Sequence, residues 1–164
     1  MSDENIWLGL DPGLATIGWA VLTEDRQGTP KLLDYGIIET NADLSTPQRL
    51  VEIERDLVEL IEEFEPTQAV IEMPFFGRHI KAAGGVLQAV GIINLVCCRE
   101  ADIEPIQLHQ SSWKAHLGNG RATKGEVAEI IATLFDMEKL PVDDSVDAIA
   151  IGYAGLCGLT NNIS

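Results

Sequence analysis

The sequence is poor in basic residues. Its 11 lysines and arginines stand against 26 aspartates and glutamates, which gives a formal net charge of −15 at pH 7. On this balance alone a polyanionic partner is disfavoured. Cysteine is also scarce: Cys97, Cys98 and Cys157 lie in apolar surroundings, without the spacing of a metal site or a disulfide framework. We expect reduced core cysteines, as in a cytosolic protein.

Two further features are missing from the sequence. No apolar run approaches the length of a membrane span, and the acidic, polar start (residues 1–5) lacks the basic and apolar parts of a secretory signal. We therefore expect a cytoplasmic protein without a membrane partner. With 164 residues, 46% of them apolar, and no linker or repeat, residues 1–164 predict a single domain with a sizeable core.

The few basic residues are unevenly distributed. Residues 1–72 carry 4 basic and 16 acidic groups, and residues 126–164 carry 1 and 7. Only residues 73–125 have a positive balance, with 6 basic and 3 acidic groups. The cations of this basic segment are Arg78, Lys81, Arg99, Lys114, Arg121 and Lys124. The segment is either a binding surface or an ordinary scatter of surface charge.

Apolar patterning predicts an α/β order. Residues 6–11, 16–23 and 32–40 are apolar or β-branched stretches joined by short turns, which is typical of an antiparallel meander. Two further strands are expected at 68–72 and 104–109. Helices are expected at 47–65, at 82–100, around Trp113 with Ser111 as its cap, and from Thr123 to 135. A last helix is expected to open with residues 141–147 and to be apolar from 148 to 159. The sum is one α/β domain with a mixed five-stranded sheet flanked by helices.

Four acidic residues fall at informative places. Asp11 and Glu72 each end a predicted buried strand just before a proline-containing turn, and Asp144 and Asp147 lie three apart at the start of a helix. A turn residue would explain Asp11, and helix capping would explain the aspartate pair. Neither explanation covers all four. Carboxylates brought together need cations, and oxygen ligands without His or Cys favour Mg²⁺ or Mn²⁺. Two such ions form an arrangement that cleaves phosphodiesters.

Four motifs in this order resemble the RuvC family of Holliday junction resolvases: LGLDPG at 8–13, VIEMPF at 70–75, QAVG at 88–91 and DDSVDAIAI at 143–151. The resemblance spans roughly residues 6–155. It implies a ribonuclease H-like fold and a homodimer that makes symmetric nicks in four-way DNA junctions. It also implies two Mg²⁺ ions per active site, for which Mn²⁺ substitutes, and a nucleoid-associated setting. A branch-migration helicase is a partner that the resemblance leaves open.

Carried over position by position, the family's metal-binding acids fall on Asp11, Glu72, Asp144 and Asp147. Asp144 is preferred to its neighbour Asp143 because its three-residue step to Asp147 matches the family pattern. The family's lysines near the scissile phosphate match Lys114 and, with a one-residue gap, Lys124. The resemblance thus implies six catalytic residues, four of which also hold metal.

The resemblance also implies DNA contacts. The family's aromatic residue at the junction centre falls on Phe75, whose ring could stack on an unpaired base. We extend the DNA-binding set by Phe76, Arg78, Lys81 and Arg121, alongside Lys114 and Lys124. Phe76 fits core packing equally well, and each cation could be a solvated surface charge.

The glycine-containing helix 82–100 matches the family's dimer helix, although a buried core helix would have the same composition. The acidity of the chain departs from the family, whose members are generally basic or near neutral. We therefore expect either weak DNA binding that depends strongly on salt and Mg²⁺, or a high-salt cellular setting, in which acidic surfaces are common. In both cases the acidic helix 47–65 is expected to face away from DNA.

Three other functions compete with a junction endonuclease. One is a related metal-dependent nuclease with broader specificity for branched DNA, and another is a non-catalytic junction-binding protein. The third is an ATP-binding protein of the actin and sugar-kinase type, whose phosphate loop begins with a similar turn. That architecture repeats the fold and needs about twice this length, which disfavours it.

Overall fold

The computed structural model describes residues 4–74, 80–139 and 143–159. Five strands form one sheet in the order β3-β2-β1-β4-β5. The antiparallel meander is confirmed: β1 (Trp7–Asp11), β2 (Thr16–Glu24) and β3 (Pro30–Glu39) are neighbours. Strands β4 (Gln68–Glu72) and β5 (Ile106–Leu108) add to it in parallel, so the sheet is mixed as expected.

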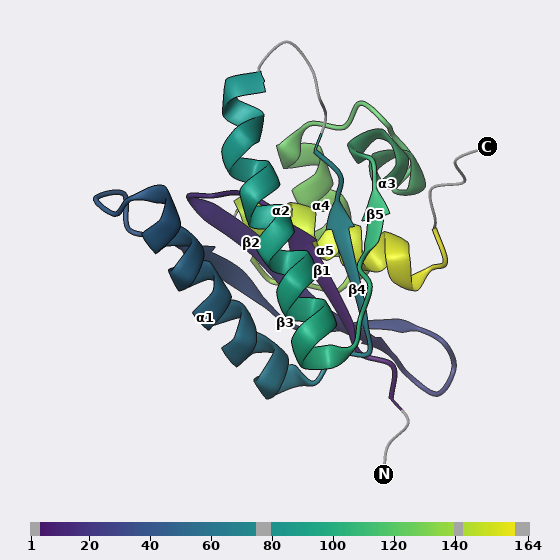
Figure 1. The fold of residues 1–164 in the computed structure, drawn as a ribbon. Helices are drawn as coiled ribbons and strands as arrows, with labels where there is room; N and C mark the ends of the chain where they lie inside the picture. The colour runs from purple at the N-terminus through teal and green to yellow at the C-terminus, as the bar shows by residue number, and fades with distance from the viewer. Residues whose placement is uncertain (1–3, 75–79, 140–142, 160–164) are drawn as a thin grey trace, which may run out of the picture.

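Helices cover both faces of this sheet (Figure 1). Helices α1 (Thr46–Phe64) and α2 (Ile80–Ala101) lie on one face, and α4 (Lys124–Leu134) and α5 (Asp143–Leu156) lie on the other. The short helix α3 (Gln110–His116) follows β5 at the edge of the sheet. Successive strand residues point to opposite faces of the sheet and so belong to two hydrophobic cores. Leu8 and Leu10 lie in the core on the side of α1 and α2, and Ala20 and Val70 lie in the core on the side of α5.

Two helices begin with the capping boxes that their sequences contain. Ser45 caps α1 together with Gln48, and Thr123 caps α4 together with Glu126. The expected cap of α3 is wrong: His109 occupies the N-cap position without a side-chain hydrogen bond, and Ser111 already lies inside the helix. The helix starts earlier because β5 is short and the chain turns directly after Leu108.

Glycines let α5 lie flush against the sheet. A Cβ atom on Gly9 would collide with the Ala148 carbonyl, and one on Gly18 would collide with the Asp144 carbonyl. Gly18 pairs with Asp11 across the β1–β2 ladder. The first turn of α5 is therefore fixed above the end of β1, which brings the acidic start of the helix to the acidic end of the strand.

Helix α2 is buried on one side only. Ala89, Ile93 and Val96 are buried against the core, whereas Leu87 and Leu95 are 40% and 50% exposed. By length and composition, residues 84–101 could cross a membrane, which the sequence analysis did not expect. In this fold the buried side of α2 packs in the core with α1, as a helix of a globular domain does.

The expectation that all three cysteines lie in the core is wrong. Cys97 is buried, but Cys98 and Cys157 are exposed, although all three thiols are free.

A Cβ atom on Gly85 would touch Leu14, whereas one on Gly84 or Gly91 would meet nothing within 4 Å. These two glycines do not mark close packing within the domain.

Candidate active site

The parallel pairing of β1 and β4 sets two carboxyl groups side by side. Leu10 lies opposite Ile71 in the ladder, so Asp11 and Glu72 end neighbouring strands at the same edge of the sheet. Both residues are partly buried, and a side-chain hydrogen bond joins them. Two carboxyl groups can share such a bond only while one of them holds a proton.

Helix α5 brings two more acids to this edge. Asp144 lies in its first turn with its carbonyl against Gly18, and Asp147 follows three residues later with only 5% of its surface exposed. Both carboxylates act electrostatically on Asp11. The four predicted acids thus converge from β1, β4 and α5, while the side chain of Asp143 lies outside the described part of the chain.

Burial and neighbouring negative charge perturb these groups. Burial first, and then the charges of Glu72 and Asp147, raise the pKa of Asp11 from 3.8 to about 8. Burial also raises the pKa of Glu72, although hydrogen bonds from Trp113 and Asp11 and the charge of Lys114 act in the opposite direction. In the absence of a cation, Asp11 therefore keeps its proton at neutral pH, and its O–H donates a hydrogen bond to the carboxylate of Glu72.

The sequence analysis did not single out Trp113 as a site residue. Its side chain is fully buried, and its indole Nε1 donates a hydrogen bond of 3.3 Å to Oε1 of Glu72. The Lys114 Nζ lies 5.6 Å from the centroid of the same ring. A signal existed in the sequence, since a tryptophan directly before a predicted catalytic lysine has an N–H group that must find a partner when buried.

The predicted lysines lie near the acids. The positive charge of Lys114 lowers the pKa of Glu72. The Nζ of Lys124 lies 3.9 Å from Oδ1 of Asp144. Arg121 is exposed in the turn before α4, and its backbone N–H bonds to Asn119. Helix α2 begins at Ile80, so Lys81 lies in its first turn, but the Lys81 side chain is outside the described residues. Phe75, Phe76 and Arg78 also lie outside them.

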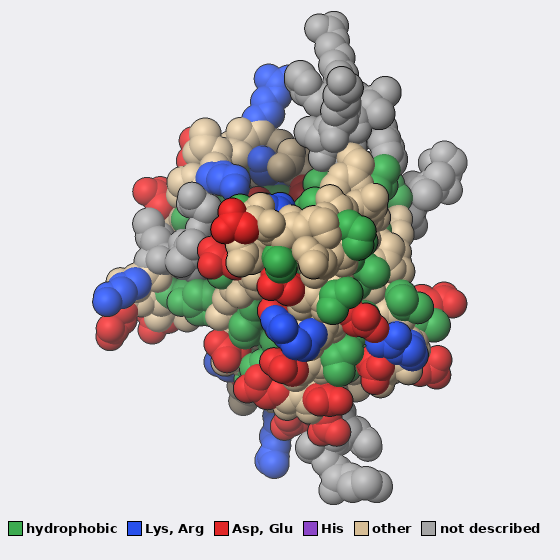
Figure 2. Space-filling model, turned by 60° about the vertical axis from the view of Figure 1, so that its left-hand side comes forward, with side chains coloured by type: hydrophobic (Ala, Val, Ile, Leu, Met, Phe, Trp, Pro, Cys, Tyr) green, Lys and Arg blue, Asp and Glu red, His purple; other side chains and the backbone are tan. Residues whose placement is uncertain are grey.

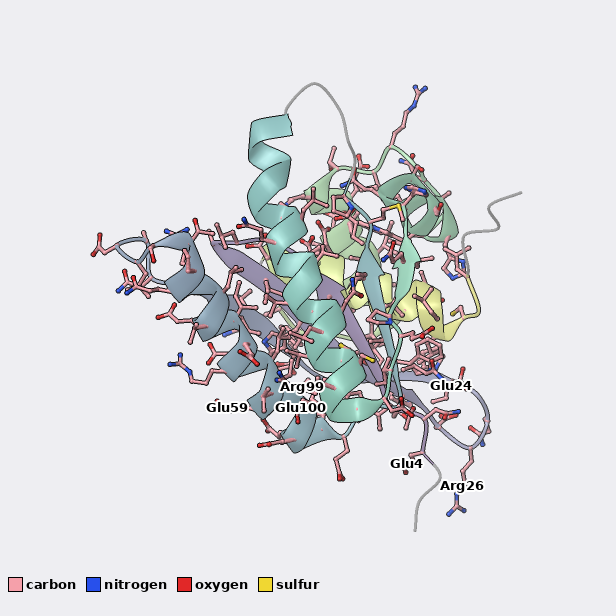
Figure 3. The ribbon with its side chains drawn as sticks, in the orientation of Figure 1. Glu4, Glu24, Arg26, Glu59, Arg99 and Glu100 are labelled. Atoms are coloured by element: carbon pink, nitrogen blue, oxygen red, sulfur yellow. The ribbon has the colours of Figure 1, made fainter. Side chains whose placement is uncertain are left out.

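One cation of the basic segment, Arg99, forms its ion pairs with acids outside the candidate site. Arg99 lies near the end of α2 and forms ion pairs of 2.7 Å with Glu54 and 2.8 Å with Glu100 (Figure 3). Because α2 starts after the carboxyl end of β4 and runs back along the sheet, Arg99 is far from the four acids. Among the cations of the segment whose side chains the structure describes, Lys114 and Lys124 are the two that interact with the acids of the candidate site.

The donor chemistry fits a hard divalent cation. All four converging groups are carboxyls, and the pKa of Asp11 is raised first by burial and then by the charges of its acidic neighbours, which a cation would neutralise. Within residues 4–74, 80–139 and 143–159, no three His, Cys, Asp or Glu side chains are already grouped to hold an ion. Asp11 and Glu72 instead share a proton. The donor type therefore fits Mg²⁺ or Mn²⁺, while the arrangement is that of a hydrogen-bonded carboxyl pair.

Comparison with known proteins decides the family. Residues 7–154 match the family model described as crossover junction endodeoxyribonuclease RuvC. The chain is 62% identical over 157 residues to the crossover junction endodeoxyribonuclease RuvC of Synechocystis sp., with coverage of 96% of this chain and 94% of that protein. The chain belongs to the RuvC family.

Solved structures agree with this membership of the RuvC family. The Thermus thermophilus RuvC structure superposes with a TM-score of 0.80 at 26% identity, covering 93% of this chain and 96% of that one. A second structure, T. thermophilus RuvC in complex with Holliday junction substrate, has the same TM-score and coverage at 23% identity. The predicted resemblance and the ribonuclease H-like fold are confirmed. Membership of the RuvC family also decides against the ATP-binding alternative.

Proposed function

We propose that this RuvC-family chain is a structure-specific endonuclease that resolves four-way DNA junctions by hydrolysing phosphodiester bonds. The observation that carries the proposal is the convergence of Asp11, Glu72, Asp144 and Asp147 from three elements at one edge of the sheet. An acidic protein gains nothing in stability from this arrangement, because burying carboxylates together costs free energy. A catalytic role explains why the cost is tolerated.

The four carboxylates are the proposed ligands of two Mg²⁺ ions, with Mn²⁺ as a substitute. Bound there, the ions would activate the attacking water and stabilise the leaving oxygen. The proton on Asp11 must leave before its carboxylate can bind a cation, so cation binding and proton release are linked at this group.

Lys114 and Lys124 are the proposed phosphate contacts at the site. Lys124 is held near Asp144 only by a long ion pair of 3.9 Å, and its side chain is 57% exposed, so it is free to turn toward a bound phosphate. The Nζ of Lys114 lies 5.6 Å from the Trp113 ring centroid, and its positive charge lowers the pKa of Glu72. The proposed DNA contacts beyond these two lysines are Phe75, Phe76, Arg78, Lys81 and Arg121.

A homodimer would place two such sites on one junction, as symmetric nicking requires. Its proposed interface is the exposed side of α2, where Leu87, Gly91 and Leu95 form an apolar stripe. The acidic face of α1 is separate from this stripe. Figure 2, which is turned so that the α1 side of the molecule comes forward, shows many acidic side chains across the lower part of that surface. We place this face away from DNA. The proposed setting is the nucleoid within the cytoplasm, with a branch-migration helicase as an optional partner.

The proposal is tested with an immobile four-way junction, end-labelled on each strand in turn. We expect paired nicks at symmetric positions on opposing strands in Mg²⁺ or Mn²⁺ and none in EDTA. Asp11→Asn and Asp144→Asn should bind the junction and leave it uncut, while Glu129→Gln, an exposed acid on α4, should cut like the wild type. Equal cleavage of flaps or duplex would indicate the broader nuclease. Junction binding without any cleavage would indicate a binding protein.

A further inference from the structure

The indole of Trp113 lies in an unusual environment for a core residue. The side chain has no exposed surface, and it packs in the core beneath α5 with Val70, Leu108 and Ile149. Its N–H group nevertheless points to a carboxyl oxygen, Oε1 of Glu72, at 3.3 Å. A buried indole N–H needs an acceptor, and here that acceptor is one of the four converging acids.

The sheet register makes this contact possible. Glu72 lies opposite Leu108 in the parallel β4–β5 ladder, and the N–H of Met73 bonds to the Leu108 carbonyl at 2.7 Å. Helix α3 begins two residues after Leu108, and the N–H of Trp113 bonds to the His109 carbonyl in its first turn. Two residues 41 positions apart are thereby fixed side by side.

The ring of Trp113 also contacts Lys114. The Lys114 Nζ lies 5.6 Å from the ring centroid, within the range of a cation–π interaction. The side chain of Trp113, which is buried in the core, thus interacts with both the Glu72 carboxylate and the Lys114 ammonium group of the candidate site. Neither Trp7 nor Trp19 has this position, since both lie on strands and are only partly buried.

We propose that Trp113 is a positioning residue, which fixes the carboxylate of Glu72 for cation binding and orients Lys114 beside it. The inference rests on the proposed function. An outer hydrogen-bond donor that orients a ligating carboxylate typically contributes about 10–100-fold to metal affinity. The bond here is longer than the usual 2.9–3.0 Å for this type, so we expect about a tenfold contribution.

The first experiment follows the indole N–H groups of the wild-type protein by ¹H–¹⁵N NMR during a Mg²⁺ titration. The chain contains three tryptophans, and Trp113→Phe assigns the signal of interest. We expect this signal to shift as Mg²⁺ saturates the site, and to shift also in Glu72→Gln, while the signals of Trp7 and Trp19 stay in place. A Trp113 signal that is unchanged at saturating Mg²⁺ would overturn the inference.

The second experiment compares Mn²⁺ affinity, measured by electron paramagnetic resonance, in Trp113→Phe and in the matched control Trp19→Phe. Trp19 packs on Phe64 in the core on the side of α1 and α2, with ring centroids 6.0 Å apart. We expect about a tenfold loss of affinity in the first variant and none in the control. A purely structural role of Trp113 would lower the melting temperature and leave Mn²⁺ affinity unchanged.

The two proposals fail in different ways. If the wild type binds Mn²⁺ and cuts junctions while Trp113→Phe binds Mn²⁺ equally well, the positioning role is wrong and the nuclease stands. If the wild type neither binds the ion nor cuts, the proposed function is wrong and the positioning role falls with it. Should Trp113→Phe fail to fold, Trp7→Phe and Trp19→Phe assign the two other indole signals, and the NMR titration of the wild type then decides alone.

Discussion

At the scale of single residues, the account depends on Asp11. Its carboxyl group is held at the end of a buried strand with Glu72, Asp144 and Asp147 around it, and its pKa rises to about 8. Between pH 3.8 and about 8 the folded chain therefore binds a proton that the unfolded chain has released. Stability falls with rising pH in that window, by up to about 1.4 kcal/mol per pH unit from this group.

Asp11→Asn should remove this dependence. We expect the variant to unfold with a flatter pH profile than the wild type and, without divalent cations, to melt at a higher temperature at pH 8. The measurement is thermal unfolding in EDTA at several values between pH 5 and pH 8.5. Glu129→Gln, which changes an exposed acid outside the site, should retain the wild-type slope. Equal slopes for Asp11→Asn and the wild type would contradict the raised pKa.

At the scale of elements, the fit of α5 on the sheet decides whether the four acids meet. Gly18→Ala would drive a methyl group into the Asp144 carbonyl. We expect the variant to lose about 3 kcal/mol or more in free energy of unfolding. The added methyl group would press on the backbone of α5, which cannot move aside as a flexible side chain can. Denaturant unfolding measures this loss, and any folded fraction should cleave junctions poorly.

Gly125→Ala is the matched control, since a Cβ atom there meets only the Thr123 hydroxyl at 4.0 Å. It should keep or slightly increase stability, because alanine is the better helix former by up to about 1 kcal/mol. If Gly18→Ala were as stable and active as Gly125→Ala, the close approach of α5 to β2 would not matter for the site.

Most elements could be predicted from the sequence, for identifiable reasons. The alternation in 16–24, the helical period in 46–64 and the capping boxes at Ser45 and Thr123 are local signals. The four acids could be found because each stands at the end or start of a predicted element. The contact between Trp113 and Glu72 could not, since it depends on the β4–β5 register. Likewise, composition does not say that only one side of α2 is buried.

At the scale of the whole molecule, the exposed side of α2 predicts a dimer. Leu95 is 50% exposed at the C-terminal end of the apolar stripe formed with Leu87 and Gly91. Leu95→Glu should therefore give a monomer, because two buried carboxylates would have to face each other in a symmetric interface. Multi-angle light scattering measures the mass. Val51→Glu on α1, where Val51 is 64% exposed, should leave the dimer intact. A dimeric Leu95→Glu would place the interface elsewhere.

The net charge of −15 sets a second expectation for the whole molecule. Junction affinity should fall steeply as salt rises, since the few cations near the site must bind phosphates against a negative background. Binding isotherms at several salt concentrations in Ca²⁺, which is expected to support binding with little cleavage, give the slope. Lys124→Gln should reduce this slope by about one, as expected for one lost phosphate contact. Affinity that hardly changes with salt would contradict the picture.

The central claim is that Asp11, Glu72, Asp144 and Asp147 together hold the catalytic cations. It is tested most directly by counting Mn²⁺ ions bound to the junction complex of the wild type and of Asp11→Asn by electron paramagnetic resonance. The account predicts two ions per chain in the wild type. In Asp11→Asn it predicts affinity lowered by at least about tenfold, together with loss of cleavage. If Asp11→Asn bound two ions with wild-type affinity, the cations would lie elsewhere and the account of the site would be wrong.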